Sequence, residues 1–328
     1  MTRARGLPAG LALALAGCTP IQSALDPAGS NAGMVFDLGV AMTIGATLVC
    51  VLVVVLAWRA VRRSRAEGAW LASPRMVIAL GAALPAVVLT ALLAYGFVLD
   101  RQLAAEEDRA ALTVRVTGEQ WWWRVAYLAP DGSPAFETAN EIRLPVGQPV
   151  RFELESADVI HSFWVPALGG KIDLIPGRTN TVTLLAEREG IYRGQCAEFC
   201  GTQHALMAFM ARAETLEDFG AWFAAEGGDA RQPETEEEVA GHGAFVAAGC
   251  GACHAVRGTT AAGTIGPDLT HVGSRLTIAA GTLPNHAGTL AAWVTDAQAI
   301  KPGARMPSFD ELDGPTLRSI AVYLASLR

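Results

Sequence analysis

Two long apolar runs dominate the pattern of hydrophobic and polar positions along the chain, at Leu38–Trp58 and Met76–Val98. Each has about twenty residues or more, which is enough for a helix to cross a hydrocarbon core of about 30 Å. The segment around the connection between them is rich in arginine, namely Arg59, Arg62, Arg63, Arg65 and Arg75. Because positively charged loops stay in the cytoplasm, the pattern predicts a transmembrane hairpin with both ends on the outer side.

From Asp100 the pattern changes to short alternating runs separated by turn residues. Four runs predict β-strands, at Leu112–Thr117, Val125–Tyr127, Val150–Glu155 and Thr181–Leu185. Turns are predicted at Pro130–Gly132 and Pro145–Gly147, because Pro, Asp and Gly favour them. Several short strands at this spacing indicate a β-sandwich or β-barrel of Greek-key type.

The pattern changes again at residues 224–240, which predict a linker. Glycine and proline gather at Gly227–Pro233, and the acidic run Glu234–Glu238 follows and predicts a helix start. We expect this linker to be flexible and to hold the following region at an effective concentration around millimolar. Residues 241–328 follow this linker as a separate region.

Composition agrees with a membrane-anchored chain of several domains. Of 328 residues, 51% are hydrophobic and only 17% are charged, which favours membrane segments over one very large core. The chain begins with Arg3 and Arg5, an apolar run and Leu15–Cys18, a pattern that predicts an export signal over residues 1–17. Its ending resembles a bacterial lipobox, which predicts lipidation of Cys18. The alternative is a plain signal peptide cleaved nearby.

Charge is unevenly distributed along the chain. Residues 100–240 contain 24 acidic and 12 basic residues, a net charge of −12, whereas residues 241–328 contain 5 and 6, a net charge of +1. An acidic outer region can steer a basic donor protein at low ionic strength. We therefore expect a protein donor, and no nucleic acid, as the partner of this region.

The segment Cys196–Met207 concentrates ligands for a soft metal. It contains Cys196, Cys200, His204 and Met207, and sulfur with imidazole suits copper. A mononuclear blue-copper site needs one Cys, and the second thiolate favours a dinuclear copper electron-transfer centre completed by His161. The alternative is a Cys196–Cys200 disulfide in an exported protein, with His204 and Met207 as ordinary residues.

A second candidate site follows in the C-terminal part. Cys250-Gly-Ala-Cys253-His254 is typical of covalent haem c attachment through two thioethers, with His254 as the proximal iron ligand. A redox dithiol or half of a zinc site is the alternative, but neither accounts for Met306 on the proline-flanked segment that begins at Lys301. Met/His ligation is typical of electron-carrying cytochromes c. We expect a mono-haem class I cytochrome c, with His242, His271 and His286 on its surface.

The motif C-x-E-x-C-G-x-x-H-x-x-M, with H-S-F-x-V-P upstream, resembles subunit II of the haem–copper cytochrome c oxidases over about residues 30–220. The resemblance implies a cupredoxin fold with a CuA centre. It implies side-chain ligation by His161, Cys196, Cys200, His204 and Met207, and ligation by the backbone carbonyl of Glu198. It also implies that the Glu198 carboxylate helps to hold Mg or Mn where the chain meets subunit I.

Other segments also resemble known motifs or differ from them. Gly118–Trp123 resembles the aromatic motif through which electrons reach CuA, with Trp121 at the accepting position, and aromatic packing is the alternative. Lys171–Arg178 resembles a motif that faces subunit I, and Gly266-Pro267 resembles the segment whose carbonyl orients the proximal histidine. Many such subunits carry a Glu near the start of the second helix, where this chain has Ile78–Pro85, so a proton-uptake role is not expected.

We therefore expect a multidomain fold: a signal peptide (1–17), a two-helix transmembrane hairpin (34–99), a β-barrel or sandwich cupredoxin domain (100–223), a linker (224–240) and an all-α cytochrome c domain (241–328). The expected function is electron transfer from a donor such as cytochrome c or a bc-type complex, through haem c and CuA, to subunit I and oxygen. The soluble domains would face the periplasm from a bacterial inner membrane. The alternatives are a CuA relay of a nitric oxide or nitrous oxide reductase, or a lipid-anchored haem-binding module without copper.

Overall fold

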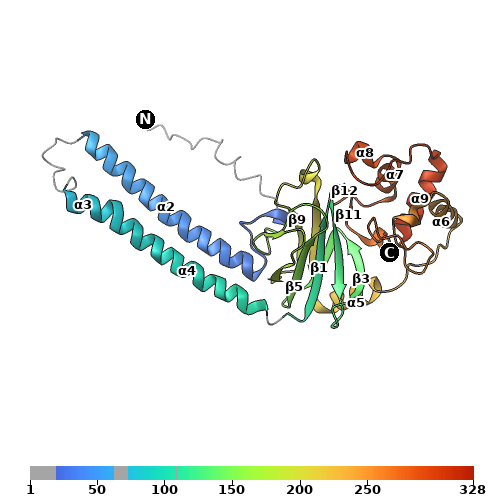
Figure 1. The fold of residues 1–328 in the computed structure, drawn as a ribbon, viewed down its shortest axis with the longest axis horizontal. Helices are drawn as coiled ribbons and strands as arrows, with labels where there is room; N and C mark the ends of the chain where they lie inside the picture. Colours follow the sequence, from blue (N-terminus) through green and yellow to red (C-terminus); the bar gives the residue numbers. More distant parts are fainter. Residues whose placement is uncertain (1–19, 63–72, 108–109) are drawn as a thin grey trace, which may run out of the picture. The chain divides into compact units, whose positions relative to one another are not determined.

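The computed structural model describes residues 20–62, 73–107 and 110–328 (Figure 1). They fall into two compact units, one within Gly33–Arg109 and the other formed by Ala110–Arg328 with the residues before Gly33. Cys18 and the connector arginines Arg63 and Arg65 lie outside the described residues.

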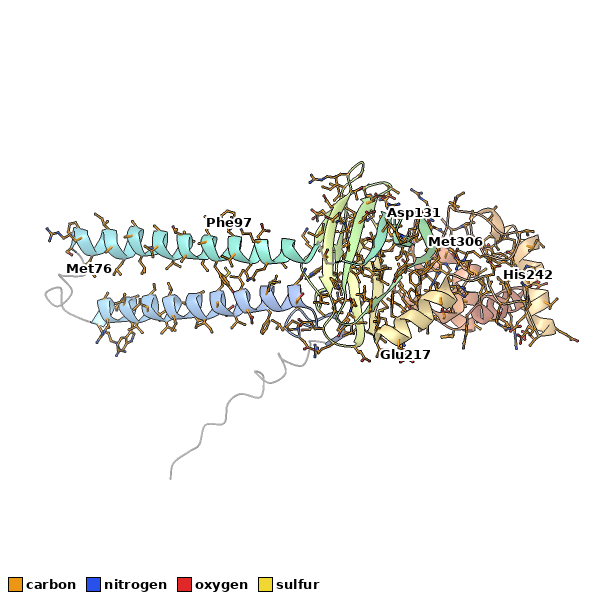
Figure 2. The ribbon with its side chains drawn as sticks, turned by 90° about the horizontal axis from the view of Figure 1, so that it is seen from below. Met76, Phe97, Asp131, Glu217, His242 and Met306 are labelled. Atoms are coloured by element: carbon orange, nitrogen blue, oxygen red, sulfur yellow. The ribbon has the colours of Figure 1, made fainter. Side chains whose placement is uncertain are left out.

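The first unit is a pair of long apolar helices, as the sequence predicts. Helix α2 spans Ser30–Arg62, and the second helix consists of α3 (Pro74–Ile78), a π-helical turn η3 (Ala79–Ala83) and α4 (Leu84–Glu107). Both helices are long and apolar enough to cross a membrane. In each helix, no residue of the most apolar 18-residue segment is buried. Apolar side chains such as Phe97, which is 62% exposed, point away from the helix axis (Figure 2). We expect lipid to surround these side chains.

The π-helical turn has a local cause. Pro85 follows it, and a proline inside a helix removes one hydrogen bond and clashes with the carbonyl four residues earlier. That carbonyl belongs to Gly81, in the middle of η3. The wider turn relieves this clash while the helix continues, as is typical of π-bulges.

The β domain (residues 110–226) is a sandwich of two five-stranded sheets (Figure 1). The first sheet has the order β3-β2-β1-β5-β8, with β1 Leu112–Glu119, β2 Trp122–Leu128, β3 Pro134–Ala139, β5 Pro149–Ser156 and β8 Asn180–Leu185. The second has the order β4-β10-β9-β6-β7, with β4 Glu141–Pro145, β6 His161–Trp164, β7 Ile172–Leu174, β9 Gly190–Cys196 and β10 Ala208–Glu214. All four predicted strands are confirmed.

Alternation along these strands builds the core between the sheets. In β1 the buried residues Val114 and Val116 alternate with less buried neighbours, and β5 repeats this with Phe152 and Leu154. Fully buried aromatic side chains fill the centre, and helix α5 (Leu216–Glu226) closes one end with further aromatic rings. A rigid scaffold of this kind holds the loops at its edge in fixed positions.

The three adjacent tryptophans do not all lie on a strand. Trp121 lies in the two-residue turn between β1 and β2, whereas Trp122 and Trp123 begin β2. Trp123 is fully buried against Phe163 and Phe209, and Trp121 is only partly buried. Trp121 therefore lies outside the strand that contains its two neighbours.

The C-terminal region (residues 236–328) is helical, with its own core. Its helices are α6 (Glu236–Ala247), α7 (Ala287–Thr295), α8 (Ala297–Ile300) and α9 (Gly314–Ser326), with the short elements η5 (Cys250–Ala252), η6 (Val272–Ser274), β11 (Thr277–Ile278) and β12 (Leu283–Pro284). Helix α6 starts at a capping box formed by Thr235 and Glu238. It crosses α9 at Gly241, where a Cβ atom would lie 2.0 Å from Ser319 O, so a side chain there would separate the helices.

The segment between α5 and α6 is packed, which differs from the expectation of a flexible linker. Ala230 is 5% exposed and its N–H donates to Arg257 O at 3.0 Å. Arg231 donates to Ser326 O at 2.8 Å. The prediction that His271 lies on the surface is wrong, because it is 6% exposed and contacts Gly228 O through Nε2 at 3.3 Å. His286 is exposed, as predicted, and caps α7.

Candidate functional site

The predicted ligand residues meet where strands β9, β6 and β10 of the second sheet end or begin. Cys196 ends β9, and the cysteine loop (Cys196–Met207) runs from there to the start of β10. His161 begins β6, which pairs with β9 so that Phe163 lies opposite Cys196. Strand pairing therefore brings together two residues that are 35 positions apart in the chain.

Four potential ligand groups converge around the two cysteine sulfur atoms. Their separations are 3.7 Å for Cys196 Sγ–Cys200 Sγ, 3.9 Å for Cys196 Sγ–His161 Nδ1, 3.6 Å for Cys200 Sγ–His204 Nδ1, 3.8 Å for Cys200 Sγ–Met207 Sδ and 3.1 Å for Cys196 Sγ–Glu198 O. A disulfide bond is about 2.05 Å long, so the two thiols are free. The disulfide interpretation of this loop is therefore wrong.

Burial and mutual hydrogen bonding give the two thiols different acidities. The hydrogen bond from the Cys200 thiol, which outweighs burial, lowers the pKa of Cys196 to about 3. The Cys196 thiolate in turn, together with burial, raises the pKa of Cys200 well above its usual range. The pair thus holds one proton between two sulfurs, and a metal ion that displaces this proton finds two soft anionic ligands.

This donor set fits copper. The sulfur and nitrogen atoms of His161, Cys196 and Cys200 all lie within 4.8 Å of one another, and all three residues are buried. Met207 is fully buried and adds a thioether, a soft ligand that suits copper. The exposed Glu198 contributes its carbonyl on this side, while its carboxylate turns to Lys171 at 3.3 Å.

Neighbouring groups fix the orientation of the site. Asp158 Oδ1 lies 2.7 Å from His161 Nε2, which leaves Nδ1 directed to the sulfurs. Burial tends to raise the pKa of Asp158, but hydrogen bonds from His161, Gln120 and Val159 outweigh it and lower that pKa. The carbonyl of Cys200 accepts two hydrogen bonds from the β1–β2 turn, from Gln120 Nε2 at 2.8 Å and Trp121 Nε1 at 2.9 Å. The turn and the cysteine loop are thereby tied together.

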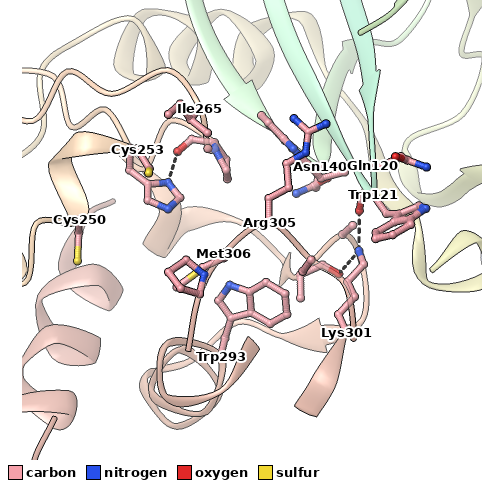
Figure 3. Close-up of a pocket in the computed structure, with 18 of the residues that line it drawn as sticks. Gln120, Trp121, Asn140, Cys250, Cys253, Ile265, Trp293, Lys301, Arg305 and Met306 are labelled. Carbon is pink, nitrogen blue, oxygen red and sulfur yellow. Dashed lines mark hydrogen bonds between the residues drawn. The ribbon is translucent and has the colours of Figure 1, made fainter. Parts of the chain in front are cut away.

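A large apolar pocket in the same unit brings the second set of predicted residues together (Figure 3). It contains about 1020 Å³ of space, part of it open to solvent, and is lined by Cys250, Cys253, His254 and Met306. His254 Nδ1 lies 2.8 Å from Pro267 O, as the Gly266-Pro267 segment predicts. Burial lowers the pKa of His254, so its imidazole is neutral and Nε2 remains available to a metal ion. The apolar lining and the donor atoms fit a haem.

Trp121 and Trp122 of the β domain also line this pocket. The methionine loop (Lys301–Met306) lies against Trp121, because Lys301 Nζ donates to Trp121 O at 2.6 Å (Figure 3). Gln203 of the cysteine loop donates to Pro302 O at 2.7 Å. Sequence analysis missed the roles of Lys301 and Gln203. One available signal was that Lys301 is one of only two lysines in the chain.

Comparison with known proteins gives a consistent picture. A sequence profile described as cytochrome c oxidase subunit II, periplasmic domain, matches residues 128–214, and a cytochrome c profile matches residues 239–328. The chain is 34% identical over 343 residues to cytochrome c oxidase subunit 2 of Alkalihalophilus pseudofirmus, covering 100% of this chain and 98% of the relative. It is 30% identical over 345 residues to cytochrome c oxidase subunit 2 of Bacillus subtilis, covering 96% and 95%.

Solved structures include a similar domain. The periplasmic domain of subunit II of cytochrome oxidase from Bradyrhizobium japonicum is 38% identical to this chain. The match covers 36% of this chain and 94% of that one, with a TM-score of 0.33.

Proposed function

Because the chain belongs to the cytochrome c oxidase subunit 2 family, we propose that it is subunit II of a bacterial respiratory oxidase, with its cytochrome c fused in the same chain. The family implies a copper centre in the β domain and a haem in the C-terminal region. The chief support for a direct relay is Trp121, which donates to Cys200 O at 2.9 Å and borders the haem-sized pocket.

The proposed ligands of a dinuclear CuA centre are the side chains of His161, Cys196, Cys200, His204 and Met207, with the backbone carbonyl of Glu198. His161 begins β6, Cys196 ends β9 and Met207 directly precedes β10. The sheet therefore limits the movement of these three residues. A site that rearranges little keeps the cost of a change in oxidation state low. Asp158 orients His161, as carboxylates commonly do for metal-bound histidines.

The proposed haem ligands are His254 and Met306, with thioether bonds from Cys250 and Cys253. The hydrogen bond between His254 Nδ1 and Pro267 O at 2.8 Å fixes the ring orientation. Met306 lines the same pocket and belongs to the loop that follows α8. When bound, haem and copper supply one-electron redox chemistry, which would carry electrons from an external donor to subunit I for reduction of oxygen to water.

Oxygen chemistry would belong to the partner subunit. All six histidines of this chain follow residue 160, so neither predicted membrane span offers one to a haem or to copper. Contact with subunit I is proposed through Glu198 and Lys171–Arg178. The carboxylates of Glu198 and Asp173 lie 3.3 and 3.0 Å from Lys171 Nζ. In the complex, Mg or Mn would replace the lysine amine as the cation that these carboxylates bind.

The proposed localisation is a bacterial inner membrane crossed twice, with the β domain and C-terminal region on the periplasmic face. Residues 1–17 would be removed as a lipoprotein signal and Cys18 lipidated. The helices of residues 34–99 would form the anchor, followed by the copper domain (100–223), the linker (224–240) and the cytochrome domain (241–328). External donors would be a cytochrome c or a bc-type complex.

Metal analysis tests this function on the purified full chain. We expect about two copper ions per haem, with the near-infrared absorption and copper EPR spectrum of a mixed-valence pair. Haem without copper would favour a lipid-anchored haem-binding module instead. Purification with a partner that reduces nitric oxide and consumes no oxygen would favour a reductase relay.

A further inference from the structure

The two lysines of the chain have opposite surroundings. The Lys171 side chain is 46% exposed and pairs with Asp173 and Glu198. Lys301 is 3% exposed although it belongs to a loop. Burying an amine is costly unless its hydrogen bonds are satisfied, so a buried lysine on a loop indicates a specific task.

The amine of Lys301 joins two parts of the fold. Its Nζ donates to Trp121 O at 2.6 Å, in the β1–β2 turn, and contacts Ala279 O at 3.4 Å in the C-terminal region (Figure 3). These partners are carbonyl oxygens, which accept from a neutral amine as well as from a charged one. The four-carbon stem fills the space between the turn and the methionine loop.

Two further contacts seat the same loop. Gln203 Nε2 donates to Pro302 O at 2.7 Å. Gly303 has a φ of +87°, which favours glycine, and a Cβ atom there would lie 3.4 Å from Trp121 Cζ3. The loop therefore lies against both the backbone and the ring of Trp121, whose indole N–H is bonded to Cys200 O.

We propose that Lys301 is a positioning residue that seats the methionine loop on Trp121, so that the loop presenting Met306 also docks the C-terminal region on the β domain. The proposal deepens the proposed function and rests on it, since Lys301 fixes one of the described contacts that join the haem pocket, through Trp121, to the cysteine loop. It also means that the methionine loop of the same chain contacts Trp121 on one side. An external donor would then deliver electrons to the fused region and not to Trp121.

Amine labelling of the wild-type full chain in detergent provides the first test. Because there are two lysines, peptide mass spectrometry after brief exposure to an acylating reagent reports each separately. We expect Lys301 to be modified at least about tenfold more slowly than Lys171, since reaction requires local opening. Equal rates in the folded chain would overturn the proposal.

A variant that removes only the amine provides the second test. Lys301→Met keeps an apolar stem of similar length, and Lys301→Arg restores a donor. Hydrogen exchange at Ala208 N–H and Leu276 N–H, which bond across the same interface to Ala280 O and Glu141, reports docking directly. We expect exchange at both amides to be faster in Lys301→Met by at least about tenfold, unchanged at Val125 within β2, and partly restored in Lys301→Arg.

The rate of electron transfer from haem to copper in the same variants provides the third test. After an electron is injected into the haem by light, its passage to copper should slow at least about tenfold in Lys301→Met, because small displacements have large effects on such geometry. Unchanged exchange and transfer would overturn the positioning role. Copper and haem contents measured on each sample separate this outcome from failure of the proposed function, which would appear as missing copper in the wild-type chain.

Discussion

Asp158 shows how one carboxylate can set the geometry of a metal ligand. Its Oδ1 lies 2.7 Å from His161 Nε2, and its Oδ2 accepts from Gln120 N at 2.7 Å. In Asp158→Asn the amide binds the ring more weakly, so copper affinity should fall about tenfold or more. Competition with a copper chelator measures this. Asp26→Asn, at an exposed pair with Arg188, is the control and should leave the affinity unchanged.

Met207 is the second residue whose role can be isolated. It is fully buried with Sδ 3.8 Å from Cys200 Sγ, and leucine has a similar volume. Met207→Leu should therefore fold, alter the reduction potential of the copper centre, slow turnover and leave the haem spectrum unchanged. Redox titration followed in the near infrared measures the potential. Loss of the haem spectrum would show that Met207 serves the haem site instead.

Lys301 also predicts a pH dependence. Burial, opposed weakly by the nearby Cys200 sulfur, lowers the pKa of Lys301 to about 7 from 10.5 in the unfolded chain. Between these values the unfolded state binds more protons, so the folded state gains stability as pH rises from 7 toward 10.5. The melting temperature of the wild-type chain should rise relative to Lys301→Met between pH 7 and 9, and a constant difference would contradict the shift.

At the scale of elements, the methionine loop depends on helix α8. Gln298 of α8 donates through Nε2 to Ala304 O and Met306 O, both at 2.7 Å, and accepts through Oε1 from Gly303 N at 3.0 Å. One side chain thus satisfies three backbone groups of a loop that has no regular structure of its own.

Removing this brace should loosen Met306 without detaching the haem. In Gln298→Leu each lost hydrogen bond costs about 1 kcal/mol. The methionine–iron charge-transfer band should therefore disappear at a lower temperature than in wild type, while the covalent haem is retained. In Gln298→Glu, which keeps the hydrogen-bond acceptor for Gly303 N, the band should disappear at a temperature between those of Gln298→Leu and wild type. A band as stable as in wild type would show that Gln298 is not needed to hold the loop.

Strand β1 was predictable because its residues alternate. Strand β1 has buried Val114 and Val116 between less buried neighbours, which gives a clear period of two. Strand β6 has only four residues, three of them buried in succession, and β9 contains two glycines. These two strands carry His161 and Cys196, so the elements that build the metal site were the hardest to predict.

Ligand residues within the cysteine loop were predictable because they share one short segment. His161 was not derivable from spacing, since only the pairing of β6 with β9 brings it to Cys196. The sequence likewise did not locate the turn that ends β1, in which Trp121 lies. Local patterns specify residue types and short elements, whereas sheet pairing over long separations does not appear in them.

At the scale of the whole molecule, the main difference from expectation is that the C-terminal region is docked and not loosely tethered. The contacts that dock it come from residues scattered along both parts. Ala208 N donates to Ala280 O at 3.0 Å, and Leu276 N donates to Glu141 Oε2 at 2.7 Å. Isolated residues such as these have no periodicity or motif, so no sequence pattern could have predicted the interface.

Arg257 offers a further test of this docking. Its guanidinium pairs with Asp268 within the C-terminal region. It also donates to the carbonyls of Glu226 and Glu137 in the β domain and to that of Gly228 in the segment that joins the two regions. A planar fork is needed to serve acceptors on several sides at once. Arg257→Met should therefore weaken the interface by about 2 kcal/mol, the scale of hydrogen bonds to a charged group.

Docked regions stabilise each other and should unfold together, whereas Arg257→Met should unfold in two steps. Haem absorbance follows the C-terminal region and calorimetry follows the whole chain, so the two midpoints should coincide in wild type and separate in the variant. Arg318→Met is the matched control, because its side chain is 77% exposed and pairs with Glu237 inside the C-terminal region. If Arg257→Met melts in one transition at the wild-type temperature, the arginine does not hold the two regions together.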